Sequence, residues 1–301
     1  MTRQKSATTA GIALCCAVVG VGLAGCDADT DGDSSAPAPA PEKGAGEDLL
    51  TGTQTITVGD HTVKVSCSGE PADGRPLVVL LHGGGDDLTT MAPFQETLSA
   101  DGRVCSYDRL GAGGSDQPER PQDYDSVGET LTGVLDQVAG DEPVVLVGHS
   151  MGGLIAGRYA PDHQDRVAGL VLLDSTSPTA VADVSDRIPE SDTGPAGELR
   201  AHTLAIFAGE NPELLVFTDG DVASAGDIPV RVIQHGQQYL GEVPEYGEGL
   251  EEDWTAGQHK WLALSGDSEL STAENSGHYI HVDEPDVAVA AIDEVTTRAA
   301  G

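Results

Sequence analysis

The fold is decided by the stretch Pro143-Val-Val-Leu-Val-Gly-His-Ser-Met-Gly-Gly-Leu-Ile-Ala-Gly-Arg-Tyr159. Residues 144–147 form an unbroken apolar run with the length and β-branched content of a strand buried on both faces. The apolar residues after Gly152 suit a helix, so the chain is expected to turn sharply at Ser150. Gly148 and Gly152 would give that turn its clearance, because residues with a Cβ would crowd the backbone there.

Ser150, at the centre of this Gly-x-Ser-x-Gly pattern, is a candidate nucleophile. The turn would expose its hydroxyl, and the following helix would point free N–H groups and the positive end of its dipole at developing negative charge. The same pattern also arises by chance in strand-to-helix turns that carry an incidental serine. The buried strand before it and the helix after it favour the nucleophile.

Strand and helix patterns alternate on both sides of this turn. We expect further strands at residues 53–58, 61–67, 76–83, 103–108, 167–173, 229–234 and 270–274, and helices at 91–100, 126–138, 199–207, 254–264 and 285–298. Gly59-Asp60 predicts a hairpin between the first two strands. The alternation indicates an α/β fold with a mostly parallel central sheet and helices on both faces. Residues 175–227 interrupt it and predict a small cap outside the sheet.

The first 48 residues are expected to lie outside this domain, which would span residues 49–301. Residues 1–25 combine a basic start with an apolar run too short to span a bilayer comfortably, as in a secretory signal. They lead into Leu23-Ala-Gly-Cys26, which resembles the lipobox of bacterial lipoproteins. The resemblance implies cleavage before Cys26, lipid on its sulfur and anchoring to the outer face of a bacterial cell membrane. An ordinary signal peptide and an uncleaved anchor are the alternatives.

The amino-acid composition predicts a tether, excludes two classes of ligand and leaves one pair of cysteines. Residues 26–48, rich in Asp, Ala, Pro, Gly and Ser, predict a disordered tether. With 15 Lys and Arg against 50 Asp and Glu, the net charge of −35 argues against nucleic acid or anionic lipid as a ligand. Once Cys26 is lipidated, Cys67 and Cys105 remain as an even pair, and an exported protein would keep them in a disulfide. Two separate buried thiols are the alternative.

Four motifs carry a resemblance to a known family. They are His82-Gly83-Gly84, Tyr107-Asp108-Arg109 with Gly111-x-Gly113-x-Ser115, Gly148-His-Ser-Met-Gly152, and Ser276-Gly277-His278. In this order and at these spacings, the chain from about residue 63 to residue 298 resembles the α/β-hydrolase fold family. The resemblance is specific for the fold and much less specific for the substrate.

A serine hydroxyl needs a general base, and the base needs an acid that orients it. His278 is the best base, because it follows the last predicted strand; His281 is the nearest alternative and otherwise suits a surface position at a helix entry. The family usually keeps its acid after the strand at 229–234, where this chain has no aspartate. Asp174, at the end of the strand at 167–173, is the preferred acid, and Glu242 is the alternative.

In the reaction of a serine nucleophile with a carbonyl group, two backbone N–H groups would stabilise the negatively charged oxygen (the oxyanion) that forms on the substrate. The N–H of Met151 directly follows the nucleophile, and Gly84 in the glycine-rich loop would supply the second. The loop could also be merely flexible. Asp108 and Ser115 are expected to brace a turn, and no pattern calls for a metal or another cofactor.

The predicted activity is hydrolysis of carboxylic esters through an acyl-enzyme formed on Ser150. A small-molecule ester with an apolar acyl group is suggested by five apolar residues of the cap, Leu204, Ile206, Phe207, Leu214 and Leu215, although a packed core would give the same pattern. Aminopeptidase-like, lactonase and haloperoxidase relatives of the fold remain open. So does a non-catalytic cell-surface binding protein on a hydrolase scaffold, which the missing acid slightly favours.

Overall fold

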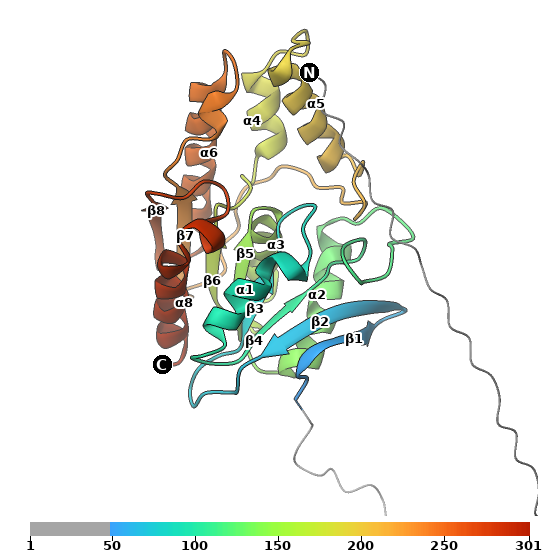
Figure 1. The fold of residues 1–301 in the computed structure, drawn as a ribbon, viewed down its shortest axis with the longest axis vertical. Coiled ribbons are helices and arrows are strands. Elements are labelled where there is room, and N and C mark those ends of the chain that lie inside the picture. The colour runs from blue at the N-terminus through green and yellow to red at the C-terminus, as the bar shows by residue number, and fades with distance from the viewer. Residues whose placement is uncertain (1–48) are drawn as a thin grey trace, which may run out of the picture. The chain divides into compact units, whose positions relative to one another are not determined.

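A computed structural model describes residues 49–301, which form a central sheet with helices on both faces (Figure 1). The predicted signal segment, Cys26 and the predicted tether lie outside the described residues. The strands are β1 (Gly52–Val58), β2 (His61–Ser68), β3 (Val78–Leu81), β4 (Val104–Tyr107), β5 (Val144–His149), β6 (Val167–Leu173), β7 (Val230–His235) and β8 (Ser268–Ala273). The helices are α1 (Leu88–Leu98), α2 (Tyr124–Ala139), α3 (Met151–Tyr159), α4 (Ala180–Arg187), α5 (Pro195–Phe207), α6 (Gly247–Lys260), α7 (Ile280–Asp283) and α8 (Pro285–Ala299).

The sheet has the strand order β1-β2-β4-β3-β5-β6-β7-β8. β1 and β2 form the predicted antiparallel hairpin, and β2 pairs antiparallel with β4. The strands β4, β3, β5, β6, β7 and β8, in this order across the sheet, are parallel to one another. The α/β fold predicted from the sequence is therefore confirmed. Because parallel strands share a direction, the ends of β5 and β6 reach the same edge of the sheet as the end of β7.

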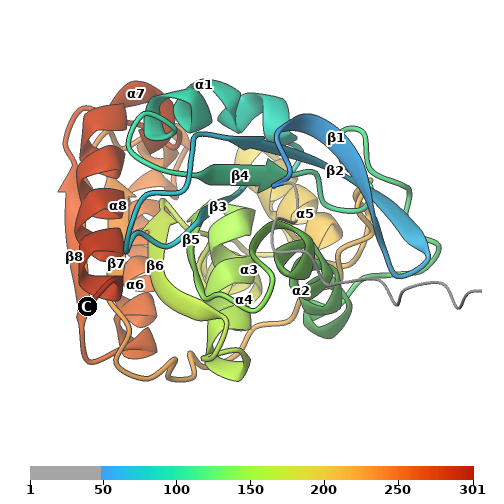
Figure 2. The same ribbon diagram turned by 90° about the horizontal axis from the view of Figure 1, so that it is seen from below.

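The apolar run of β5 faces two hydrophobic cores. Val144 and Leu146 belong to a core with residues of α2 and α3, whereas Val145 and Val147 belong to a core with residues of α1 and α8. Figure 2 shows α1 and α8 on one side of the sheet and α2 and α3 on the other. A strand covered on both faces has no polar alternation, which explains the unbroken run.

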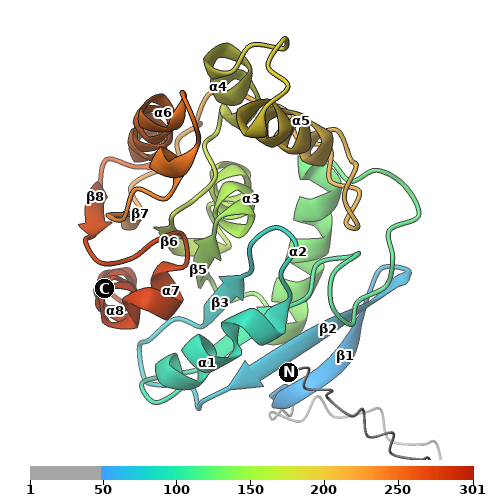
Figure 3. The same ribbon diagram turned by 45° about the horizontal axis from the view of Figure 1, so that its top comes forward.

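The segment between β6 and β7 leaves the sheet. It contains α4 and α5, which Figures 1 and 3 show beside α6 at one end of the molecule. The predicted cap covers these two helices, of which only α5 was expected from the sequence. α4 has only eight residues and buries only Val184, so it is shorter than the stretch over which helical periodicity can be recognised in a sequence. The helix predicted at 254–264 begins earlier, at Gly247, because Leu250 and Glu251 pack inward despite their acidic neighbours.

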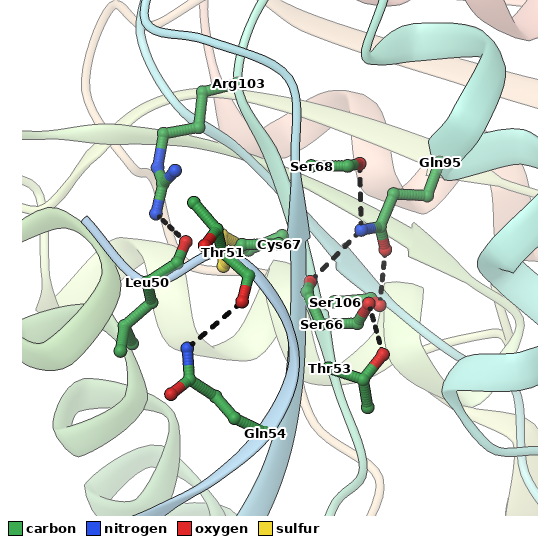
Figure 4. The surroundings of a disulfide bond; sticks show 11 residues. Leu50, Thr51, Thr53, Gln54, Ser66, Cys67, Ser68, Gln95, Arg103 and Ser106 are labelled. Carbon is green, nitrogen blue, oxygen red and sulfur yellow. Dashed lines mark hydrogen bonds between the residues drawn. A yellow bond between two sulfur atoms is a disulfide. The ribbon is translucent and has the colours of Figure 1, made fainter. Parts of the chain in front are cut away.

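A disulfide joins β2 to β4. Cys67 and Cys105 face each other directly in the antiparallel register, with their Cα atoms 4.1 Å apart. Figure 4 shows the bond, together with the Gln95 side chain that holds the same two strands by hydrogen bonds to Ser66, Ser68 and Ser106. The pairing expected for an exported protein is therefore present in the structure. Across residues 49–301, no helix is long and apolar enough to cross a membrane.

Candidate active site

Ser150 lies in a strained turn between β5 and α3. Its backbone has φ 51° and ψ −118°, a conformation that residues other than glycine rarely adopt. A Cβ on Gly148 would come within 2.5 Å of the Gly152 backbone, and a Cβ on Gly152 would come within 2.3 Å of the Leu81 carbonyl oxygen. Only glycine fits these two positions, so the clearance predicted for the turn is confirmed.

Asp174 and His278 meet beside this turn. The Nδ1 atom of His278 is 2.7 Å from Oδ2 of Asp174. Asp174 directly follows β6, is fully buried and has φ 43°, which makes it a second strained residue at this edge of the sheet. Burial by itself would raise the pKa of Asp174, but hydrogen bonds from His235 and His278 outweigh it and hold this pKa below its ordinary value.

The Ser150 hydroxyl shares a cavity with the His278 imidazole, but within residues 49–301 the two make no hydrogen bond. Instead, Oγ of Ser150 is 3.5 Å from Oγ1 of Thr176. Rotation about χ1 moves a serine hydroxyl without changing the backbone, and catalytic hydrogen bonds often tighten only when substrate is bound. The arrangement is therefore compatible with proton transfer from Ser150 to His278.

The two alternative residues lie in other surroundings. Glu242 is exposed at the end of a 3₁₀ turn, Leu240–Glu242, and its side chain forms no hydrogen bond or ion pair with His278 in the described part of the chain. His281 is buried in α7, so the surface position considered for it was wrong. Burial lowers the pKa of His281 to about 4, and it is therefore neutral at pH 7. Of the candidate pairs, the structure brings together His278 and Asp174.

Gly84 and Met151 lie next to each other beside the turn at Ser150. A Cβ built on Gly84 would lie 3.6 Å from Cβ of Met151, and both residues line the same cavity as Ser150. Neither backbone N–H donates a hydrogen bond inside the range 49–301. Two free donors beside a serine hydroxyl have the composition of an oxyanion hole.

The side chain of Arg109 holds the loop that carries Gly84. Its buried guanidinium donates to the carbonyl oxygens of His82, at 2.6 Å, and Gly83, at 2.9 Å. The same guanidinium pairs with Glu213, at 2.6 Å, from the segment between β6 and β7. Asp108 accepts the backbone N–H groups of Leu88 and Gly114, which confirms that it braces a turn.

A cavity of about 580 Å³ opens above Ser150. Its walls come from the segment after β6, from α4 and α5, and from α6. Its apolar lining residues include Met151, Val184, Leu199, Ile206, Phe207, Leu215, Leu240 and Leu250. The volume lies within the range of small-molecule sites. Ile206, Phe207 and Leu215 were among the predicted cap residues, whereas Leu204 packs in a core with Val184, Ile188 and Leu250.

This architecture matches known proteins. A sequence profile described as the alpha/beta hydrolase fold matches residues 76–204. A solved structure of a serine hydrolase involved in carbazole degradation has a TM-score of 0.58 and 20% sequence identity, over 81% of this chain and 98% of that chain. The chain has the α/β-hydrolase fold.

The curated relatives of this α/β-hydrolase-fold protein differ in the share of their own length that matches this chain. Uncharacterized protein YqjL of Bacillus subtilis (strain 168) is 26% identical over 218 residues, which are 72% of this chain and 82% of YqjL. The human (lyso)-N-acylphosphatidylethanolamine lipase is 32% identical over 113 residues, or 36% of this chain and 33% of the lipase. The chain likewise spans about a third of the length of several other curated relatives that it matches.

Sequence reasoning missed the residues behind Asp174. Oδ1 of Asp174 accepts hydrogen bonds from Nδ1 of His235, at 2.8 Å, and from Nε1 of Trp254, also at 2.8 Å. The Nε2 atom of His235 is 2.8 Å from Oε2 of Glu251 in α6. The signal available in the sequence was the position of His235, which ends the strand after which this fold usually keeps its acid.

Proposed function

We propose that this protein is a serine hydrolase that cleaves neutral carboxylic esters with an apolar acyl group through an acyl-enzyme. One observation carries the proposal. Ser150, a His278 imidazole bonded to buried Asp174, and the free N–H groups of Gly84 and Met151 all border one apolar-walled cavity. Each group that acyl transfer requires is then present at one edge of the sheet.

The reaction would proceed in two halves. Oγ of Ser150 attacks the ester carbonyl carbon while Nε2 of His278 takes the hydroxyl proton, and Asp174 stabilises the imidazolium that forms. The N–H groups of Met151 and Gly84 stabilise the oxyanion of the tetrahedral intermediate. His278 then gives its proton to the leaving alcohol, which departs and leaves the acyl group on Ser150. Water, activated by His278, repeats the sequence, releases the carboxylic acid and restores Ser150.

Charge in the cavity supports a neutral acyl group. As formed by the described residues, the lining includes no lysine or arginine but four carboxylates, Asp183, Glu210, Glu213 and Asp253. Glu213 pairs with Arg109, and Asp253 pairs with Arg187. Glu210, by contrast, has no cationic partner within residues 49–301 and would repel a second carboxylate.

We expect kcat/KM for p-nitrophenyl esters to rise about tenfold from acetate to butyrate, because two methylenes gain burial against the cavity wall. The p-nitrophenyl hemisuccinate, which carries a carboxylate on a four-carbon acyl group, should react at least about tenfold more slowly than the butyrate. Glu210→Gln should reduce this discrimination. Glu198→Gln, exposed on α5 and outside the cavity lining, is the matched control.

The same panel tests the alternatives when it includes a prolyl arylamide and a γ-lactone. Preferred turnover of the arylamide would favour an aminopeptidase, and preferred turnover of the lactone a lactonase. If no member of the panel shows turnover that Ser150→Ala removes, the chain is better explained as a binding protein on a hydrolase scaffold.

We further propose that the protein is exported and held at the outer face of a bacterial membrane by lipid on Cys26. The support is the Leu23-Ala-Gly-Cys26 ending of the apolar segment. In a bacterial host, Cys26→Ser is expected to abolish labelling by palmitate and to move the protein out of the washed membrane fraction. Cys16→Ser, inside the apolar segment, is the matched control. Equal lipid labelling of both variants would contradict the anchor.

A further inference from the structure

His235 lies between two buried carboxylates. Its Nδ1 is 2.8 Å from Oδ1 of Asp174, and its Nε2 is 2.8 Å from Oε2 of Glu251. The exposed fraction is 7% for His235, 0% for Asp174 and 6% for Glu251. The second oxygen of Glu251 accepts the backbone N–H of Gly241, at 3.0 Å. Both carboxylates are therefore fixed in place around the ring.

Proton counting decides the charge of this ring. A neutral imidazole has one N–H, so it could donate to only one of the two carboxylates and would turn a lone pair toward the other. At 2.8 Å, two facing acceptors repel each other. The geometry therefore requires one additional proton in the His235–Glu251 contact, and an imidazolium that donates from both nitrogens satisfies every atom.

The other groups around His235 do not supply a competing charge. Tyr239, whose ring centroid is 4.7 Å away, is kept neutral because burial raises its pKa. The Trp254 ring centroid is 6.1 Å from that of His235, and His278 contacts the Asp174 carboxylate through Oδ2, to which Nδ1 of His235 is also close, at 3.0 Å. For His235 itself, burial would lower the pKa, but the hydrogen bonds and charges of Asp174 and Glu251 outweigh it and raise this pKa above the ordinary value.

We propose that His235, held as an imidazolium by Glu251, is a positioning residue that fixes the Asp174 carboxylate against His278. Asp174 needs such support because its backbone is strained, with φ 43°. His235 donates two hydrogen bonds to the Asp174 carboxylate, one from Nδ1 and one from its backbone N–H, whose nitrogen is 3.1 Å from Oδ1. The inference rests on the proposed function, since it assigns Asp174 as the acid of that site.

The charges of the three residues suit this role. Asp174, His235 and Glu251 together carry a net charge of −1, so the imidazolium does not cancel the negative field that His278 requires. Above the raised pKa of His235 the extra proton leaves, and a lone pair then faces Glu251. Repulsion between this lone pair and Glu251 displaces the ring, which weakens the hydrogen bond from Nδ1 to Asp174, and activity should fall on the alkaline side.

Glu251→Gln is the sharpest variant because it preserves shape. The amide oxygen would keep the bond from Gly241, and the amide nitrogen would then donate to Nε2 of His235. His235 would become neutral while still donating from Nδ1 to Asp174, and the net charge would stay at −1. We expect His235 to lose its extra proton at least one pH unit lower than in the unaltered protein, and the alkaline fall in kcat/KM to disappear. Glu252→Gln, on an exposed neighbour in the same helix, should change neither.

The protonation state is read from ¹⁵N-histidine NMR spectra of Ser150→Ala, with His235 assigned by the loss of its signals in His235→Asn. Two protonated nitrogens on His235 at pH 7 are expected. A single protonated nitrogen on His235 in these spectra would by itself overturn the proposal. Identical pH profiles of kcat/KM for Glu251→Gln and Glu252→Gln would also overturn it. Because the spectra need no turnover, an unreactive protein with a doubly protonated His235 would contradict the proposed function and leave the charge assignment standing.

Discussion

Ser150→Ala is expected to lower kcat/KM for p-nitrophenyl butyrate by about 10⁴- to 10⁶-fold, as loss of the nucleophile does in serine hydrolases with a working triad. The variant removes the atom that would form the acyl bond. The Thr176 hydroxyl, 3.5 Å from Oγ of Ser150, lies in the segment after β6 and not in the strained turn before α3. Residual turnover would come from the cavity and the two N–H groups alone.

The fold should survive this change, because alanine keeps the Cβ that the turn at φ 51° already accommodates. Thermal unfolding followed by circular dichroism checks this point. A fluorophosphonate probe should label the unaltered protein once, at Ser150. Ser224→Ala, an exposed serine away from the cavity, should label normally. Persistent labelling of Ser150→Ala would exclude Ser150 as the nucleophile.

The turn at Ser150 could be predicted because its constraints are local. Gly148 is required because a Cβ there would meet the backbone of Gly152 and Gly153, within the same sharp strand-to-helix turn. The central strands could be predicted for the same reason, since burial on both faces leaves an unbroken apolar run. Such features need no knowledge of what lies far away in the sequence.

The pairing of Asp174 with His278 could be predicted from their positions after strands, but the support of Asp174 by His235 and Glu251 could not, because it depends on residues that meet only in the folded chain. Asp174 directly follows β6, His235 ends β7, Glu251 lies in α6, and His278 lies in the loop after β8. Glu251 lies in an acidic run, Glu251-Glu-Asp253, that is typical of a solvent-exposed helix face, yet it is buried. Its carboxylate lies 2.8 Å from Nε2 of His235, and sequence spacing does not reveal that pairing.

Asp174→Asn is expected to lower kcat by up to about 10⁴-fold, and the hydrogen bonds around the carboxylate show why. Oδ1 accepts from His235 N–H and Trp254 Nε1, and Nδ1 of His235 is closer to Oδ1, at 2.8 Å, than to Oδ2, at 3.0 Å, so the amide oxygen of asparagine must take the Oδ1 position. The amide nitrogen then replaces Oδ2 and donates to Nδ1 of His278. This forces the proton of His278 onto Nε2, where it can no longer accept the proton of Ser150.

Glu242→Gln provides the comparison, because Glu242 was the competing acid and its side chain is exposed in the turn that follows β7. We expect its kcat/KM to stay within about twofold of the unaltered protein, as for most surface substitutions. Both variants are measured on one activated ester at several pH values, with folding checked by circular dichroism. An inactive Glu242→Gln beside an active Asp174→Asn would reverse the assignment. It would also leave the strained backbone of Asp174 and its four donors without a catalytic reason, since a carboxylate that only closes a strand would not need to be held against His278 at 2.7 Å.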